Sequence, residues 1–386
     1  MGCVVAIVAA TPYRGDDLIN KDVRTTAHAA GQTLFDVISS ISSAWMTNQG
    51  RFFPGSLAWS YSLFWFVDSR VGYKLVLGLA TTGAVAVFAL LVARLTGRWK
   101  SAALFVPIVL GVIQLRTWHD GIDSFAGLLP ITAGLSVLAV VILISRRGPG
   151  WAAIALLSYS LAVITYEAVV LFVPVMVAVV VWRRRTWRPA LAIVIPAVVE
   201  LGITAYLKMS LHVPAAPGYT ISLDPRAVLV TFAKQVLAAF PLSQWFLSGD
   251  SMPAIGVGSI TISLLVVGVP AFLAVAELGR SSMRATRMEI IAIAGFGAWI
   301  WLSSSALIAI TTRWQAEIVL GQGYLSVVYG YFGLALCLLS AVLLVERVVA
   351  GRSERAIGTW RYGSALVIAI IVSLTFAGNI TVASIP

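Results

Sequence analysis

The stretch YKLVLGLATTGAVAVFALLVAR, residues 73–94, decides the fold class of this chain. Its charged residues are Lys74 and Arg94, which lie close to its two ends, and apolar side chains dominate the residues between them. A helix needs about 20 consecutive apolar residues to cross the hydrocarbon core of a bilayer. The stretch therefore predicts a membrane-spanning helix.

Similar apolar runs occur along the whole chain, so we expect a single transmembrane module over residues 1–386. The pair of runs at 151–165 and 168–182 is too long for one span, and we expect two short helices that meet near Glu167. The pattern predicts an all-α, polytopic integral membrane protein with about eleven transmembrane helices, several of them short. The runs are 1–11, 73–94, 101–115, 124–144, 151–165, 168–182, 189–207, 259–278, 289–310, 324–346 and 364–383.

The composition supports the same fold class. Of the 386 residues, 59% are hydrophobic and only 11% are charged, whereas a soluble domain has about 25% charged residues. This excludes a water-soluble enzyme. The two cysteines, Cys3 and Cys337, both lie in apolar runs, so neither a disulfide framework nor a metal-binding spacing is visible.

The uneven distribution of charge predicts the orientation in the membrane. The short loops at 94–100, 146–150, 183–188, 279–289 and 347–361 contain 16 of the 27 basic residues. With Glu277 and Glu346, which lie just before two of these loops, they have four acids, a difference of +12. The opposite face has 11 bases and 11 acids when Glu167 is counted with it. By the positive-inside rule the first face is cytoplasmic. The net charge of +11 is then a topology signal and not a nucleic-acid-binding surface, and we expect a multi-pass protein of the bacterial plasma membrane whose active site faces outward.

Two long segments, 12–72 and 208–258, then become extracytoplasmic loops, and long loops of this kind often carry function. In the first loop, Asp16, Asn20, Arg24 and His28 recur every four residues and share one helix face. The apolar stripe that follows, from Leu34 to Trp45, predicts an amphipathic helix in the membrane interface. Asp16 and Asp17 are either helix caps or candidates for a catalytic base near the lipid headgroups.

Four further segments have charged residues close to aromatic residues at this outer face. Arg51 lies in a Gly-Arg-Phe-Phe-Pro turn, where a guanidinium is suited to bind a phosphate with two hydrogen bonds. Glu167 lies between two apolar half-spans, where an ionisable group needs a partner or a water-filled cavity. The other candidates for substrate contact or for support of a carboxylate are Arg116, His119, Asp120, Arg313, Trp314 and Gln315.

Together these motifs resemble those of the polytopic GT-C glycosyltransferases of bacterial envelopes, and more narrowly the GtrII-like and actinobacterial members. The resemblance rests on Asp16-Asp17 at the start of a long outer loop, Gln49 to Pro54 (QGRFFP), the Thr165-Tyr166-Glu167 apex, and Arg313-Trp314-Gln315. It implies a polyprenyl-phosphate sugar as donor, a glycan or lipid as acceptor, and a first-loop Asp as general base. This chain departs from better-known members in its very short first span and in having no large soluble domain.

No cofactor is required by the sequence. A divalent metal occurs in some members of the group, but the chain has only three histidines and we predict no metal ligands. Alternative functions are a lipid-linked sugar transporter or flippase, an O-antigen-type polymerase or ligase, and an inactive scaffold. The glycosyltransferase hypothesis requires that Asp16 or Asp17, Glu167 and at least one arginine line one cavity.

Overall fold

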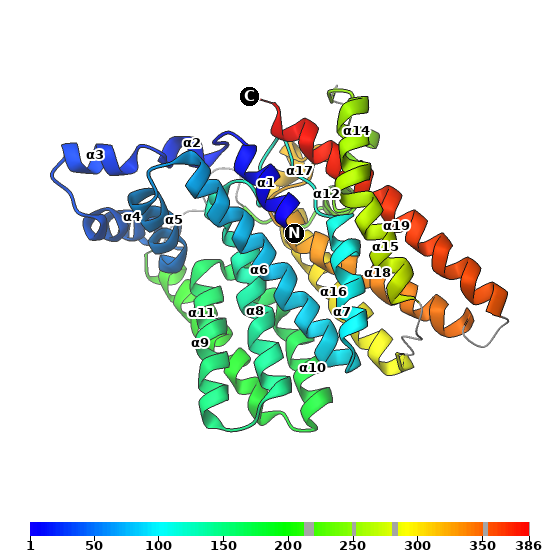
Figure 1. The fold of residues 1–386 in the computed structure, drawn as a ribbon. Coiled ribbons are helices and arrows are strands. Elements are labelled where there is room, and N and C mark those ends of the chain that lie inside the picture. Colours follow the sequence, from blue (N-terminus) through cyan, green and yellow to red (C-terminus); the bar gives the residue numbers. More distant parts are fainter. Residues whose placement is uncertain (212–219, 249–251, 280–284, 350–353, 386) are drawn as a thin grey trace.

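The computed structural model describes residues 1–211, 220–248, 252–279, 285–349 and 354–385 (Figure 1). In these residues the chain is helical and has no strand, apart from one isolated bridge between Ile221 and Thr311. The predicted all-α class is therefore confirmed. Residues 212–219 and 249–251 of the predicted loop at 208–258, and Arg280, Arg284 and Arg352 of the predicted cytoplasmic loops, lie outside the described residues.

Seven helical segments are long and apolar enough to cross a membrane, which agrees with a multi-pass membrane protein. Each corresponds to one of the predicted runs, extended by a few residues where a polar cap or a turn begins it. They are α6 (Arg70–Thr96), η1 with α8 (Phe125–Ser145), η3 with α11 (Arg188–Ser210), α14, η4 and α15 (Val257–Leu278), α16 (Arg287–Ala309), α18 (Val327–Val349), and Gly358–Ala383 within α19 (Glu354–Ala383).

The predicted count of about eleven spans is not confirmed, because the other four runs form shorter helices. These are α1 (Gly2–Ala10), α7 (Trp99–Leu110), α9 (Pro149–Thr165), and η2 (Glu167–Phe172) followed by α10 (Val173–Arg184). The break between α9 and η2 falls at Tyr166, whose backbone is extended, as we expected from Glu167. The run at 101–115 was predicted too long, since its helix ends at Leu110 and residues 112–115 are buried without helical structure.

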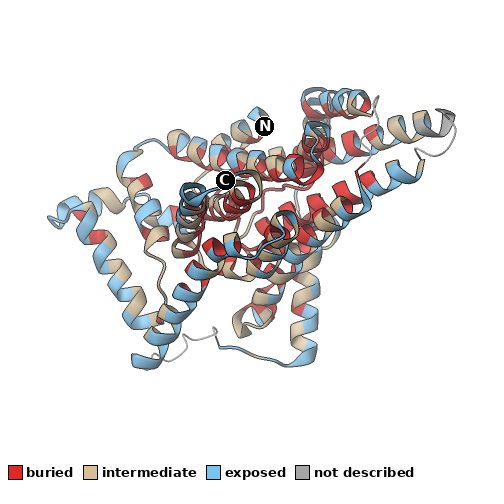
Figure 2. Cartoon of the chain, turned by 90° about the horizontal axis from the view of Figure 1, so that it is seen from below, coloured by how far each residue is buried: buried red, intermediate tan, exposed pale blue. Residues whose placement is uncertain are grey.

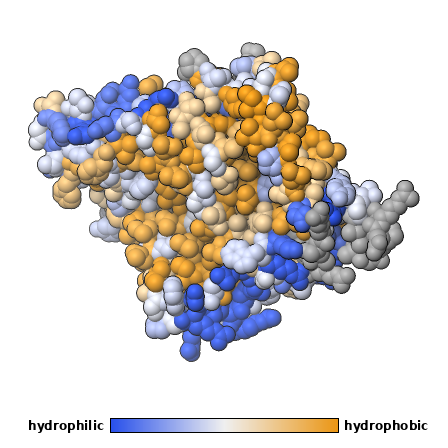
Figure 3. Space-filling model, in the orientation of Figure 1, coloured by the Kyte–Doolittle hydropathy of each residue, from blue (hydrophilic) through white to orange (hydrophobic). Residues whose placement is uncertain are grey.

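The polar regions gather at two ends of the helical bundle, with an apolar band between them (Figure 3). At one end lie the short helices of the first loop, and at the other lie the turns that join α8 to α9 and α10 to α11 (Figure 1). The interfacial helix predicted from Leu34 is α4 (Leu34–Gln49), which starts with a capping box of Thr33 and Asp36. The remaining short helices are α2 (Asp16–Asn20), α3 (Val23–Ala29), α5 (Pro54–Phe66), α12 (Pro225–Ala238), α13 (Ser243–Phe246) and α17 (Thr312–Glu317).

The buried core runs through the middle of the bundle (Figure 2), and α8 and α18 are the most buried long helices. Small residues let α16 and α18 pack closely, because a side chain on Gly297 or Gly333 would lie 2.5 Å from the carbonyl oxygen of the other. Phe88 of α6 stacks on Phe332 of α18, with 4.5 Å between ring centroids. This packing holds α6, α16 and α18 together in the core.

Candidate functional site

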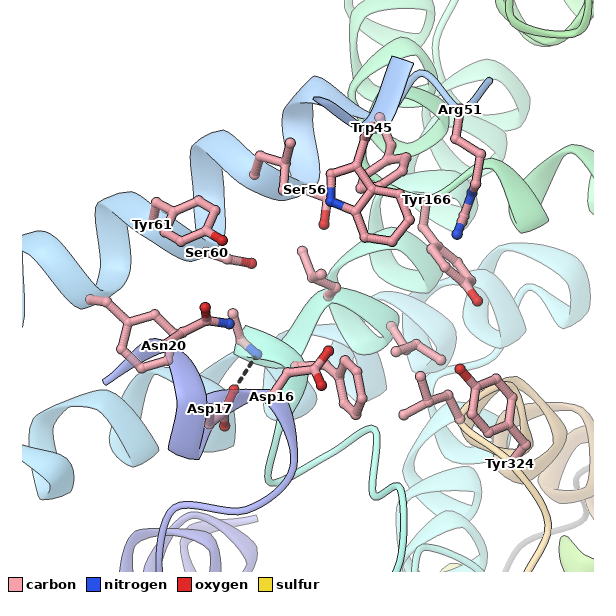
Figure 4. Close-up of a pocket in the computed structure, with 18 residues that line it drawn as sticks. Asp16, Asp17, Asn20, Trp45, Arg51, Ser56, Ser60, Tyr61, Tyr166 and Tyr324 are labelled. Atoms are coloured by element: carbon pink, nitrogen blue, oxygen red, sulfur yellow. Dashed lines mark hydrogen bonds between the residues drawn. The ribbon is translucent and has the colours of Figure 1, made fainter. Parts of the chain in front are cut away.

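A cavity of about 270 Å³ opens at the end of the bundle where the first-loop helices lie (Figure 4). Its volume is close to the lower end of the roughly 300–1,000 Å³ usual for small-molecule sites. The lining comes from α2, α4, α5, the start of α8, and the segments that precede η2 and α18. Its residues are Asp16, Asp17, Asn20, Trp45, Arg51, Phe53, Ser56, Leu57, Ser60, Tyr61, Phe64, Phe125, Ala126, Leu128, Leu129, Tyr166, Tyr324 and Leu325.

Asp16 is the first residue of α2 and its carboxylate points into this cavity (Figure 4). Gly15 precedes it with a positive φ of 55°, a conformation in which glycine is the least strained residue. Partial burial raises the pKa of Asp16 above its ordinary value, and the nearby His119 opposes that rise. A half-desolvated carboxylate that faces an open space is suited to accept a proton from a bound hydroxyl.

Asp17 also lines the cavity, but its carboxylate is 1% exposed and turns toward the protein. Its Oδ2 lies 3.8 Å from Nζ of Lys74, and its Oδ1 accepts a hydrogen bond of 3.4 Å from the backbone N–H of Ala126 (Figure 4). Burial raises the pKa of Asp17 to about 6, against the opposing effects of Lys74, Tyr73 and the Ala126 N–H. The structure thus gives the two neighbouring aspartates different surroundings.

Lys74 belongs to a buried ionic network beneath the cavity. It is 0% exposed and donates a hydrogen bond to the backbone carbonyl of Asp123. The Asp123 carboxylate lies 3.4 Å from Nη1 of Arg14, and Nη2 of Arg14 donates to the carbonyls of Val382, in the last turn of α19, and Ile385, just after it. The network ties α2, α6, the 116–124 segment and the end of α19 together.

Arg51 lies at another side of the cavity from Asp16 (Figure 4). Its Nε donates a hydrogen bond of 2.9 Å to Oε1 of Glu167, and its Nη2 contacts the same oxygen. The guanidinium also packs over the rings of Phe53 and Trp45, at 4.7 and 5.7 Å from their centroids. Glu167 does not line the cavity, so the expectation that Asp16 or Asp17, Glu167 and an arginine line one cavity is only partly met. Glu167 instead accepts a hydrogen bond from the arginine that lines it.

His119 and Trp314 lie just behind the cavity wall. The His119 ring is 5.3 Å from the ring of Tyr324, and Trp314 stacks on Tyr324 at 3.7 Å. Tyr324 lines the cavity, so its ring separates His119 and Trp314 from the cavity.

Arg116 and Asp120 are buried inside the protein, so we correct their expected role. Arg116 is 1% exposed and donates to the carbonyls of Gly321, Gln322 and Ala238 and to the hydroxyl of Tyr331. Asp120 accepts hydrogen bonds from the backbone N–H groups of Arg116, Ile122 and Asp123. Both side chains stabilise the 116–124 segment, and neither lines the cavity.

Three other predicted residues are also placed away from the cavity. Arg24 pairs with Asp68 at 2.5 Å on an exposed surface. Arg313 pairs with Glu317 one helical turn away, at 3.0 Å. Gln315 donates to the carbonyls of Ser222 and Ala309, and so holds two outer segments together.

Sequence reasoning did not assign a site role to Lys74 or to the cavity residues Ser56, Ser60, Tyr61, Tyr166 and Tyr324. For Lys74 the signal was present, because a lysine within a membrane-spanning run needs a partner. The serines and tyrosines of the cavity have no comparable signal of their own, since such residues are common at membrane interfaces.

Among the residues that the structure describes, no group of three or more His, Cys, Asp or Glu side chains could hold a metal ion. In comparisons with known proteins, no family model, curated protein or solved structure matches the chain.

Proposed function

We propose that the protein is a membrane glycosyltransferase of the extracytoplasmic face, which transfers a sugar from a polyprenyl-phosphate donor to an envelope acceptor. The observation that carries the proposal is that Asp16 and Arg51 line the same cavity at the outer-loop end of the bundle. They come from different parts of the first loop, and one is an acid while the other is a cation. This pairing is what transfer from a lipid-linked sugar phosphate needs.

In the proposed reaction the acceptor hydroxyl attacks the anomeric carbon of the donor sugar. Asp16 takes the hydroxyl proton as the new C–O bond forms. The bond between the anomeric carbon and the phosphate oxygen breaks, and the phosphate keeps the electron pair. The products are the glycosylated acceptor and the prenyl phosphate, so no nucleotide or redox partner is required.

Arg51 stabilises the charge that develops on the leaving phosphate. A guanidinium suits this role because it can bind two phosphate oxygens at once. Glu167 and the aromatic rings of Phe53 and Trp45 hold the side chain in place before substrate binds. Because the guanidinium is already oriented, the protein does not have to reorganise it, at a cost in free energy, during the reaction.

The test is transfer in membranes or detergent with short-chain prenyl-phosphate monosaccharides labelled in the sugar. We expect Asp16→Asn to lower the transfer rate by about 10²–10⁴, the usual contribution of a general base. Asp68→Asn is the matched control, because it makes the same change on an exposed residue outside the cavity. Release of prenyl phosphate is measured together with the labelled product.

Transfer at the wild-type rate by Asp16→Asn would remove that residue as the base. Movement of intact donor across the membrane, with the sugar–phosphate bond unbroken, would favour the transporter alternative. Transfer of oligosaccharide but never of monosaccharide would favour a polymerase or ligase.

A further inference from the structure

The two sides of the cavity have different chemistry, and this separates the two substrates. Arg51, Trp45 and Tyr166 lie on one side, whereas Asp16 lies on the other, close enough to His119 for the two charged groups to interact (Figure 4). If the proposed function is correct, the phosphate lies near Arg51. The acceptor hydroxyl must reach Asp16, so the acceptor lies on the side of Asp16.

A group of aromatic rings, Trp118, His119, Phe125, Trp314 and Tyr324, lies on that same side, and we call it the aromatic cluster. His119 is at its centre, with ring centroids 4.1 Å from Trp118, 5.9 Å from Trp314 and 6.4 Å from Phe125. Phe125 and Tyr324 also line the cavity, so the aromatic cluster is in direct contact with the cavity wall. Trp118 and His119 are only half-buried, and they leave ring surface accessible.

Two residues of the aromatic cluster, His119 and Phe125, have an uncommon backbone conformation with a positive φ. His119 has a φ of 45° and Phe125 a φ of 54°. This left-handed region is uncommon for residues other than glycine, and asparagine, aspartate and histidine adopt it more often than the rest, so Phe125 is the more strained of the two. The buried Arg116 and Asp120 hold the segment that contains His119 in this conformation. Strain of this kind is retained where the surrounding structure enforces it, and it is concentrated at functional sites.

The geometry points to the aromatic cluster as the acceptor subsite, and to an uncharged saccharide as the group that it binds. This inference rests on the proposed function and names its acceptor class. A sugar ring presents a C–H face that stacks on the ring of Trp118, and hydroxyls that hydrogen-bond to His119. A phosphate headgroup fits less well, because Asp16 carries negative charge here and Arg313, the nearby cation, is paired with Glu317.

The direct test is binding of short neutral oligosaccharides to the protein in nanodiscs, followed by saturation-transfer NMR. We expect Trp118→Ala to weaken binding about fivefold to tenfold, as expected for the loss of one aromatic contact. Trp118→Phe keeps an aromatic ring and should lose less. Trp187→Ala removes an exposed tryptophan at the turn before α11, away from the cavity, and serves as the matched control.

A second variant tests the contribution of the His119 imidazole without adding strain to the backbone at this position. Asparagine tolerates positive φ better than most residues, so His119→Asn should fold while it removes the imidazole. We expect weaker oligosaccharide binding in this variant as well. In turnover assays, both variants should raise KM for the acceptor by a similar factor.

Equal oligosaccharide binding by wild type, Trp118→Ala and His119→Asn would overturn the subsite, whatever the enzymatic activity. Wild-type binding that Trp118→Ala abolishes, in a protein that never cleaves a prenyl-phosphate sugar, would keep the saccharide subsite and overturn the glycosyltransferase. Binding of anionic lipid headgroups in preference to neutral sugars would also contradict the inference.

Discussion

Asp16 and Asp17 are adjacent in the chain, yet their carboxylates have different surroundings in the folded protein. The helix α2 turns Asp16 into the cavity and Asp17 toward Lys74. Asp16 has solvent-accessible space in which a substrate can bind, whereas Asp17 is enclosed by protein. We therefore propose Asp16, and not Asp17, as the base, a choice that the sequence left open.

The pH dependence of transfer should report the ionisation of Asp16. Burial raises the pKa of this carboxyl, and a base must be ionised, so activity is present above that pKa and is lost as the pH falls through it. We expect kcat/KM to fall on the acid side with a midpoint above 3.8, the ordinary value for an aspartate. The measurement is a pH–rate profile with a saturating acceptor. A rate that stays constant down to pH 4, where an ordinary carboxyl is still about half ionised, would contradict it.

Replacement of Arg51 by lysine tests the phosphate contact. Lysine keeps the charge but cannot form the two-pronged hydrogen bond, and it cannot be held by Glu167 in the same way. We expect KM for the donor to rise about tenfold, since a charge-assisted hydrogen bond contributes roughly 1.5–3 kcal/mol. Arg24→Lys, on the exposed Arg24–Asp68 pair, is the control and should leave KM unchanged. A rise in KM for the acceptor alone would show that Arg51 does not bind the phosphate.

At the scale of helices, the ion pair between Asp17 of α2 and Lys74 of α6 positions Asp16, the proposed base. A fully buried lysine is tolerated only with partners, and Lys74 has Asp17 and the carbonyl of Asp123. The pair therefore fixes α2, and with it Asp16, to a long membrane-spanning helix. Arg14 extends the same connection to the end of α19.

Removal of the charge of Lys74 alone should destabilise the protein more than removal of the charges of both Lys74 and Asp17. Lys74→Met leaves Asp17 buried without its cation, and breaking a buried pair in this way costs about 3–5 kcal/mol. The double variant Lys74→Met with Asp17→Asn removes both charges and should recover much of that loss. Thermal unfolding in detergent measures the stability, and sugar transfer by the double variant shows whether Asp17 is needed as a base. Equal stability of the single and double variants would mean that the two side chains do not interact.

At the scale of the whole molecule, the arrangement of charge agrees with one orientation in the membrane. The arginine-rich turns and the first-loop helices lie at opposite ends of the bundle (Figures 1 and 3). With the positive-inside rule, the cavity then faces away from the cytoplasm.

Cysteine labelling in intact cells tests this orientation. Ser39→Cys lies on an exposed face of α4, and Thr186→Cys lies in the exposed turn after α10. We expect a membrane-impermeant thiol reagent to label the first in intact cells and the second only after permeabilisation. The native Cys3 and Cys337 are half-buried in helices, and the unsubstituted protein measures their background. The reverse labelling pattern would place the cavity in the cytoplasm and exclude an extracytoplasmic transferase.

The sequence by itself determined the all-helical class and the break near Glu167, and its eleven predicted runs include the seven long helices, because each depends on local properties: the length of an apolar run, or an ionisable residue within one. It also indicated Asp16, Arg51 and Glu167 as residues of interest. Only the tertiary structure decided that Asp16 and Arg51 share a cavity, that Arg116 and Asp120 are buried supports, and that Lys74 lies beneath the site. The physical reason is that these outcomes depend on contacts between segments far apart in the chain, and helical periodicity carries no information about which helices meet.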